Sequence, residues 1–282
     1  MNNIQFDATL MEDDATSTST KALPKPPTDR NAPEYNMNHK NRGMAIIFNH
    51  KKFDKNSLPD RHGTDKDCTR LKNVLKKLDF DVAEHNDLCY KEIEGVIENA
   101  ASKNHANNDC ILIAIFSHGG EGHIYAKDTK YQLNNILKYF TANNCLTLAG
   151  KPKLFFVQAC KGNKSQKSFM FMCQGSIDYD SYSIPDEADF LIAYSTIPGF
   201  VSFRNTIEGS WFIQSLCQEL EENGRSYDLL TLLTFVNRRV ANESKEEKEV
   251  VKQMPSIDSR LRHLVYFKEK SKSTATSQEK KT

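Results

Sequence analysis

The sequence has little that would send the chain into a membrane or out of the cell. Its longest apolar stretches have only the length of a strand, and its N-terminus lacks a basic region followed by an apolar one. Lysine and arginine (38) nearly balance aspartate and glutamate (37), so the net charge gives no reason to expect nucleic acid or an anionic membrane as a partner. We therefore expect a globular, cytoplasmic protein with no export signal, which binds neither nucleic acid nor membrane.

The cysteine pattern argues against two further classes of protein. The seven cysteines are scattered, odd in number and never spaced C-x-x-C. This pattern is unlike a disulfide framework or a zinc site and is typical of a reducing compartment. The usual role of any single cysteine is that of a small buried hydrophobic residue. We expect no metal and no cofactor.

Both ends of the chain are too poor in apolar residues to fold alone. Residues 1–40 are rich in Thr, Ser, Asp, Pro and Asn, and we expect a flexible prodomain there and a flexible tail over residues 268–282. Between the ends, apolar runs alternate with helical periods, which predicts an α/β fold. We count six strands and five helices, hence an open, mostly parallel sheet with helices on both faces. Thr64 or Asp65 is expected to cap the first helix.

The last expected strand, residues 263–267, lies at the end of this pattern. It is therefore expected to form an edge of the sheet, where an exposed apolar strand seeks a partner. Two-fold pairing along this strand would give a homodimer.

A long segment, residues 161–187, shows no helical or strand period over about 27 positions. A loop of that length inside a compact domain is usually functional.

Two strand ends carry the residues that suggest chemistry. One apolar run leads directly into His118 and Gly119, and another leads into Cys160. Open α/β sheets bind ligands outside the carboxyl ends of their strands, so parallel neighbours would bring His118 and Cys160 face to face. A nearby imidazole favours the nucleophilic thiolate and later protonates the leaving amine. The amides of Gly119 and Cys160 are candidate donors to an oxyanion.

The string around the cysteine resembles the signature of a known protease family. Gln158-Ala159-Cys160-Lys161-Gly162, with His118 about 42 positions upstream, nearly matches the caspase signature, and only Lys161 departs from it. Further strings resemble the first arginine loop, the start of the small subunit and the substrate-binding loop of caspases: Arg61–Asp65, Ala188–Leu191, Ser202–Asn205 and Gly209–Phe212. The resemblance runs from about residue 41 to residue 267 and is greatest to the short-prodomain executioner caspases of insects.

The resemblance implies a caspase-like six-stranded sheet and a cysteine endopeptidase that cleaves after aspartate and executes apoptosis. It divides the chain into a large subunit core (41–160), an inter-subunit linker and activation loop (161–187) and a small subunit (188–267). Cys160 is implied as nucleophile and His118 as its partner, oriented by the carbonyl of Pro59. The residues implied to bind the substrate are Arg61, Gln158 and Arg204 for the aspartate, the backbone of Ser202 and Arg204 for the peptide strand, and Phe203, Asn205 and Trp211 for the outer subsites.

Caspases of this type are made as zymogens, so the resemblance also implies cleavage of this chain. The candidate cut sites are Asp178 and Asp180 in the linker, and Asp7, Asp14 and Asp29 in the leader. Cuts after Asp7 or Asp14 would expose an N-terminal alanine of the kind held by inhibitor-of-apoptosis proteins. The implied partners are these inhibitors, an upstream initiator caspase, protein substrates and a second copy of the subunit pair.

Some positions depart from the executioner pattern. Val201 stands where tyrosine is common, and the loop after Ala241 has no aromatic residue, so the sequence predicts aspartate before the cut bond and leaves the fourth substrate position open. Two other readings remain. One is a catalytically weak, caspase-like regulatory or binding protein. The other is a nucleotide-binding domain, prompted by the glycines at 119, 120 and 122, although these match neither the dinucleotide fingerprint nor the P-loop.

Overall fold

A six-stranded sheet forms the centre of the molecule. The computed structural model describes residues 26–54, 57–162, 185–243, 245–246 and 250–270. The strand order is β13-β8-β7-β3-β1-β2. Five strands are parallel and the edge strand β13 is antiparallel, which confirms the predicted mostly parallel sheet. The strands are β1 (Met44–Asn49), β2 (Asp81–Asn86), β3 (Ile111–Phe116), β7 (Lys153–Gln158), β8 (Phe190–Tyr194) and β13 (Ser256–Ser259).

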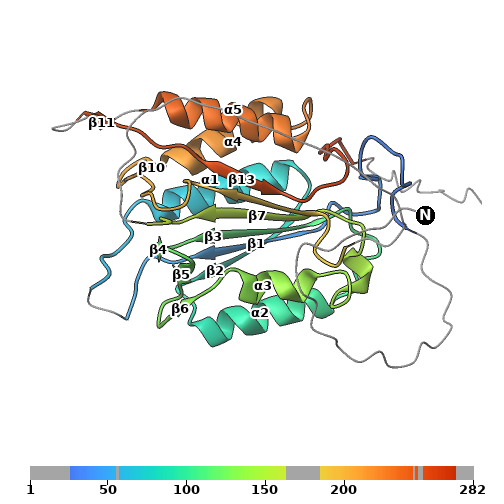
Figure 1. Cartoon of the computed structure of the whole chain (residues 1–282), viewed down its shortest axis with the longest axis horizontal. Coiled ribbons are helices and arrows are strands. Elements are labelled where there is room, and N and C mark those ends of the chain that lie inside the picture. Colours follow the sequence, from blue (N-terminus) through green and yellow to red (C-terminus); the bar gives the residue numbers. More distant parts are fainter. Residues whose placement is uncertain (1–25, 55–56, 163–184, 244, 247–249, 271–282) are drawn as a thin grey trace, which may run out of the picture.

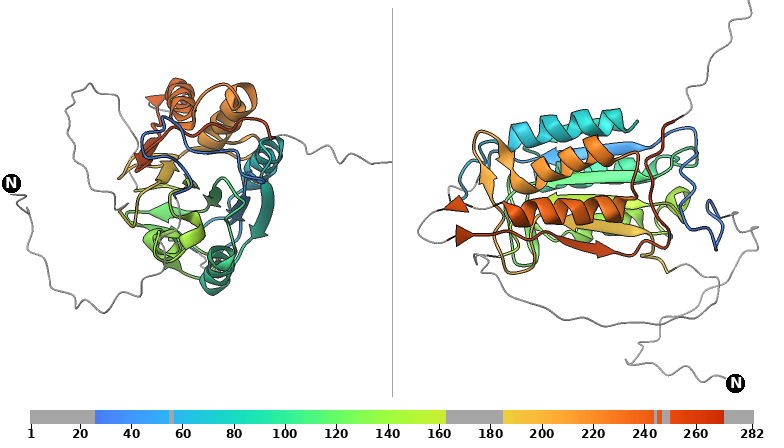
Figure 2. Two further views of the ribbon diagram at one scale, coloured as in Figure 1. Left: turned by 90° about the vertical axis from the view of Figure 1, so that its right-hand side faces the viewer. Right: turned by 90° about the horizontal axis from the view of Figure 1, so that it is seen from above.

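Helices cover both faces of this sheet, as Figures 1 and 2 show. One layer contains α1 (Thr64–Lys77), α4 (Trp211–Asn223) and α5 (Leu229–Asn242). The other contains α2 (Tyr90–Ser102) and α3 (Asn134–Leu137), followed by a 3₁₀ turn at Lys138–Phe140. Alternate side chains of β3 enter the two hydrophobic clusters, and all six are fully buried. Burial on both faces explains why this strand reads as a continuous apolar run.

Short hairpins and turns complete the fold. Two small antiparallel sheets lie where the parallel strands end, on the left in Figure 1. They are the three-stranded sheet β4–β5–β6 (Gly119–Gly120, His123–Tyr125, Lys130–Tyr131) and the hairpin β9–β10 (Arg204–Asn205, Gly209–Ser210). A second hairpin, β11–β12 (Lys245–Glu246, Val250–Val251), follows α5, and a second 3₁₀ turn spans Leu146–Leu148.

The prediction of a strand over residues 263–267 is wrong. Leu264 instead forms an isolated bridge with Glu34, and its amide and carbonyl bond to Pro33 and Tyr35. The carbonyl of Val265 accepts the amide of Leu229 at the start of α5. Because these partners use its backbone, the segment does not join the sheet. The edge strand is β13, so pairing of two copies along residues 263–267 is not supported.

Residues 26–40 are packed against the body, unlike the flexible leader expected over residues 1–40. Tyr35 and Met37 are 3% and 4% exposed. The Tyr35 hydroxyl donates to Asp189 Oδ1 at 2.7 Å, and the His39 amide donates to Asp109 Oδ1 at 2.9 Å. These anchors join positions far apart in the sequence, so no local pattern announces them.

Candidate active site

The tips of β3 and β7 meet at the carboxyl edge of the sheet. Phe116 pairs with Gln158, and the Ser117 amide continues the ladder to the Gln158 carbonyl at 3.1 Å. His118 and Cys160 each come two residues after this pair. A Cβ on Gly119 would lie 2.5 Å from the Cys160 carbonyl oxygen, so only glycine allows this approach. The structure therefore brings together the two strand tips singled out in the sequence.

The His118 imidazole has a defined hydrogen-bond partner. Its Nε2 lies 2.8 Å from the carbonyl oxygen of Pro59, the contact expected from the resemblance. A carbonyl only accepts, so Nε2 carries the proton and Nδ1 remains free to act as a base. Burial, and to a lesser degree Arg61 and Arg204, lower the pKa of His118 below 6.5, while the Pro59 bond opposes them. The imidazole is therefore neutral at pH 7.

An apolar wall that the sequence reasoning missed lies against this imidazole. The ring of Phe53 packs on His118 with centroids 4.9 Å apart and planes tilted by 46°. Behind it, at 6.4 Å, is the fully buried ring of His50, whose pKa falls to about 4, mainly through burial. Phe53 thus shields one side of His118 from water.

We expect this shielding to be measurable by titration of His118. In Phe53→Ser, water reaches the imidazole, so its pKa should rise toward 6.5, because burial is the main cause of its depression. The matched variant Phe53→Leu keeps an apolar wall and should leave the pKa low. NMR titration of the imidazole protons measures both. An unchanged His118 pKa in Phe53→Ser would show that Phe53 has no such role.

Arg61 is buried beside this pair of tips with part of its guanidinium unpartnered. Its Nη1 donates to the His50 carbonyl and to Thr64 Oγ1, each at 2.8 Å. Its Nε and Nη2 are buried without a hydrogen-bond partner. The expected cap by Thr64 or Asp65 is wrong, because the cap position of α1 is Gly63, with no side-chain bond. The Thr64 hydroxyl is engaged by Arg61 instead.

Arg204 and Gln158 lie near the same place. Arg204 Nε donates to the carbonyl of His62, the neighbour of Arg61, at 2.8 Å. Burial and then the charge of Arg204 lower the pKa of Arg61 to about 9, which leaves it protonated at pH 7. Ser202, two residues before Arg204, contacts the Cys160 sulfur through its amide, which brings the thiol close to the strand that carries Arg204. Gln158 Oε1 is buried and unpartnered, and its Nε2 donates to Ser202 Oγ at 2.8 Å.

The loop before β9 lies over the thiol. The Ser202 amide donates to Cys160 Sγ at 3.4 Å, and the Ser202 hydroxyl is held by Gln158. The pairing of the Ser202 backbone with a substrate strand stays a prediction, and in this structure the Ser202 amide contacts the thiol.

The remaining predicted subsite residues form the wall and turn of the β9–β10 hairpin. The rings of Phe203 and Trp211 pack with centroids 5.0 Å apart. Asn205 Oδ1 accepts the amides of Ile207 and Glu208, so this side chain shapes the hairpin turn. Gln253, which sequence reasoning missed, accepts the Phe203 amide at 2.6 Å and is almost fully buried. No motif surrounds it, so no sequence signal was available.

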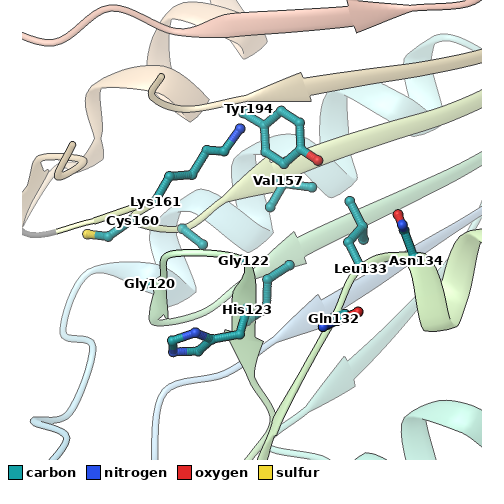
Figure 3. A pocket seen from close by; sticks show the side chains of 12 residues that line it. Gly120, Gly122, His123, Gln132, Leu133, Asn134, Val157, Cys160, Lys161 and Tyr194 are labelled. Carbon is teal, nitrogen blue, oxygen red and sulfur yellow. The ribbon is translucent and has the colours of Figure 1, made fainter. Parts of the chain in front are cut away.

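Lys161, the departure from the family signature, lies beside a cavity of about 360 Å³. Its Nζ is 3.7 Å from the ring centroid of Tyr194, and burial lowers its pKa. Figure 3 shows the lysine reaching toward that ring while the Cys160 sulfur points away from the cavity. A cation–π contact therefore satisfies the charge at this position.

Only one of the predicted cut sites lies in the described part of the chain. Asp178, Asp180, Asp7 and Asp14 fall outside the described residues. Asp29 is exposed, but its carbonyl accepts the Ala32 amide at 3.1 Å and its Oδ1 accepts the Asn31 amide at 3.0 Å. This residue is therefore held in a turn.

Comparison with known proteins gives a consistent result. Residues 42–266 match the family model for the caspase domain. Caspase drICE of Drosophila melanogaster is 53% identical over 264 residues, covering 90% of this chain and 78% of the relative. Caspase-1 of Spodoptera frugiperda is 48% identical over 272 residues, covering 92% and 91%. The crystal structure of caspase-1 from that species has a TM-score of 0.82 and 48% identity, covering 88% of this chain and 98% of that one.

One further observation concerns membranes. Within the described ranges, none of the helices combines the length and the apolar character needed to cross a bilayer.

Proposed function

The chain belongs to the caspase family of cysteine endopeptidases, and from this premise we propose that Cys160 and His118 hydrolyse peptide bonds that follow aspartate. Its relatives in insects are executioner caspases, and the protein acts in apoptosis. The assignment of roles to individual residues is our proposal. The observation that carries it is the place of Cys160 and His118 after adjacent strand tips. Arg204 follows the loop whose Ser202 amide contacts the thiol, and it donates to the carbonyl of His62, the neighbour of buried Arg61.

The unpartnered donors of Arg61 support aspartate as the recognised residue. Its Nε and Nη2 are buried and donate to no group, and a carboxylate offers two oxygens that accept such donors. Arg204 adds a second cation, and its donors other than Nε are not engaged in the described contacts. A substrate with a neutral residue at this position would leave the buried donors of Arg61 without a charged acceptor.

The chemistry follows from the two strand tips. His118 Nδ1 takes the proton of the Cys160 thiol, and the thiolate attacks the main-chain carbonyl carbon of the aspartate. The amides of Gly119 and Cys160 stabilise the resulting oxyanion. The imidazolium then protonates the leaving amine, and a thioester to Cys160 remains. Water, deprotonated by His118, hydrolyses the thioester and returns the free thiol.

A substrate series tests this proposal. We expect kcat/KM for a peptide with aspartate before the cut bond to exceed that for the matched asparagine peptide by about 10²–10⁴-fold, the effect of two charge-assisted bonds. Initial rates with fluorogenic peptides that differ only at this residue measure the ratio. Equal rates for the two peptides would refute recognition by the arginine pair.

Activation is proposed to proceed by cleavage of the linker over residues 161–187, after Asp178 or Asp180, by an upstream initiator caspase. This cut would separate a large subunit core (41–160) from a small subunit (188–267). In the leader we favour Asp14 or Asp7 over Asp29, because a protease binds extended chain and Asp29 is held in a turn. N-terminal sequencing of the processed subunits identifies the cuts.

The proposed partners follow from the same family membership. Two subunit pairs would associate along the free edge of β13, since a sheet edge offers unpaired backbone groups. Inhibitor-of-apoptosis proteins would bind the alanine exposed by leader removal. We propose the cytoplasm as the site of action.

A further inference from the structure

The β9–β10 hairpin, which carries Arg204, is tied to α1 by one buried carboxylate. Asp67, in the first turn of α1, is fully buried. Its Oδ1 and Oδ2 accept the amide of Ser210 at 2.9 and 3.1 Å. Ser210 is also the cap residue of α4, and its hydroxyl accepts the Ile213 amide. One side chain of α1 therefore fixes the junction between the hairpin and α4.

This junction lies directly opposite Arg204. In the antiparallel ladder of the hairpin, Ser210 pairs with Arg204 and Gly209 pairs with Asn205. Gly209 has a φ of +95°, and a Cβ at this residue would collide with Asp67 Oδ1. The close approach of hairpin and carboxylate therefore depends on glycine. Any movement of Ser210 passes to Arg204 through the ladder.

The opposite side of the hairpin is held by the loop of the other arginine. Arg204 Nε donates to the His62 carbonyl, and a Cβ on Gly63 would lie 2.5 Å from the Asn205 carbonyl oxygen. The hairpin is thus clamped between residues 61–63 and Asp67. Arg61 lies in the loop before α1, Asp67 lies in α1, and Arg204 lies in the hairpin.

Asp67 is a negative charge that acts on both guanidiniums, and in the described contacts none of its hydrogen bonds goes to their donors. It is the first carboxylate among the charges that raise the pKa of Arg61 and of Arg204. In the described contacts, however, its oxygens accept only from Ser210. Burial raises the pKa of Asp67 to about 6, against the lowering effect of the Ser210 bonds and the two arginines. Its commitment to Ser210 leaves the arginine donors free for a substrate.

We propose that Asp67 is a positioning residue for substrate specificity: through Ser210 it fixes Arg204 at the place where the aspartate carboxylate binds. This inference rests on the proposed function and deepens it. Asp67 does not touch the substrate. It sets the spacing between the two arginines, and that spacing separates aspartate from the longer glutamate.

The test compares Asp67→Ala with Asp67→Asn in the processed protein. In Asp67→Ala the Ser210 amide loses its acceptor, so KM for an aspartate peptide should rise about ten- to hundredfold, the effect of one buried hydrogen bond to a charged group. The preference for aspartate over glutamate should fall with it, while kcat changes by less than about threefold. In Asp67→Asn the amide oxygen still accepts from Ser210, so KM should stay within about threefold of the wild type.

Asp228→Ala is a matched control for a loss of stability alone. Asp228 is also buried and caps a helix, with Oδ1 accepting the amides of Leu230 and Thr231 at the start of α5. Its loss should lower the unfolding temperature and leave KM and the preference for aspartate unchanged. If Asp67→Ala behaves like this control, the positioning role is refuted. It is equally refuted if Asp67→Asn loses as much as Asp67→Ala, because charge and not position would then be at work.

These outcomes are separable from failure of the proposed function. If the wild-type protein cleaves aspartate and asparagine peptides equally, the arginine pair does not recognise aspartate and the proposed function itself fails. If the wild type selects aspartate and Asp67→Ala selects it equally well, only the role of Asp67 fails. Active-site titration with a peptide electrophile normalises each rate to the folded, competent fraction.

Discussion

Replacement of Cys160 by alanine is expected to lower kcat/KM by at least about 10⁴-fold, the loss found when the nucleophile of a catalytic pair is removed. Alanine keeps the backbone amide proposed for the oxyanion and removes the attacking atom. The remaining groups bind a peptide and have no means of forming the thioester. Hydrolysis of a fluorogenic peptide with aspartate before the cut bond measures the loss.

Cys89→Ala is the matched control for this prediction. Cys89 is partly exposed, as Cys160 is, and its thiol is free. It is the cap residue of α2, where its side chain takes part in a capping box and Glu92 accepts its backbone amide. Its replacement should leave kcat/KM unchanged. Residual activity of Cys160→Ala above about a hundredth of the wild type would point to another nucleophile.

The second large effect is expected from Arg204→Ala, which should reduce kcat/KM for aspartate peptides by about 10²–10⁴-fold. Two charge-assisted bonds are lost, and the aspartate carboxylate then faces Arg61 alone. The fall should lie mainly in KM if the carboxylate is bound equally in the ground and transition states. Arg204→Lys keeps the charge and loses the planar fork, so its activity should fall between those of alanine and arginine.

Arg239→Ala separates this effect from a general loss of charge. Arg239, on α5, pairs with buried Glu219 and with exposed Glu222. Its replacement should lower the unfolding temperature, because Glu219 loses its cation, and leave specificity unchanged. If Arg204→Ala keeps the preference for aspartate over asparagine, Arg204 does not bind the aspartate carboxylate.

Much of the fold was predictable because its strands and helices have local sequence patterns. Fully buried parallel strands appear as unbroken apolar runs, and each run ends at the residue where its strand ends, as at Phe116 and Gln158. The site followed from the same feature, since strand tips of a parallel sheet share one edge. His118 and Cys160 were therefore found from their position after two such runs.

The features that were missed depend on contacts between distant parts of the chain. Residues 263–267 have the composition of a strand, but the backbone partners at Pro33, Tyr35 and Leu229 are more than 30 positions away. Docking of residues 26–40 rests on Tyr35 and His39 meeting buried aspartates, which no local pattern predicts. Because residues 26–40 are mostly polar and bind the rest of the molecule through a few side chains, their composition predicts a flexible segment.

Within the site, the sequence indicated which residues carry a charge. It could not show which tertiary contacts fix their positions. Phe53, Asp67 and Gln253 are ordinary residues in their own segments, and they gain a role only from the ring, amide or loop that they meet. The contact of Ser202 with the thiol is likewise a tertiary contact, which a local pattern does not predict. Asp67 had one available signal, since it lies two residues after the arginine-loop string and in the first turn of a helix.

The central claim is that the Cys160 thiol shares a pocket with the guanidiniums of Arg61 and Arg204. Its most direct test is mass mapping after reaction of the processed protein with a peptidyl fluoromethyl ketone that ends in aspartate, beside the analogue that ends in asparagine. We predict a single adduct on Cys160 that forms at least about a hundredfold faster with the aspartate reagent. An adduct on another cysteine, or equal labelling by the two reagents, would contradict the account.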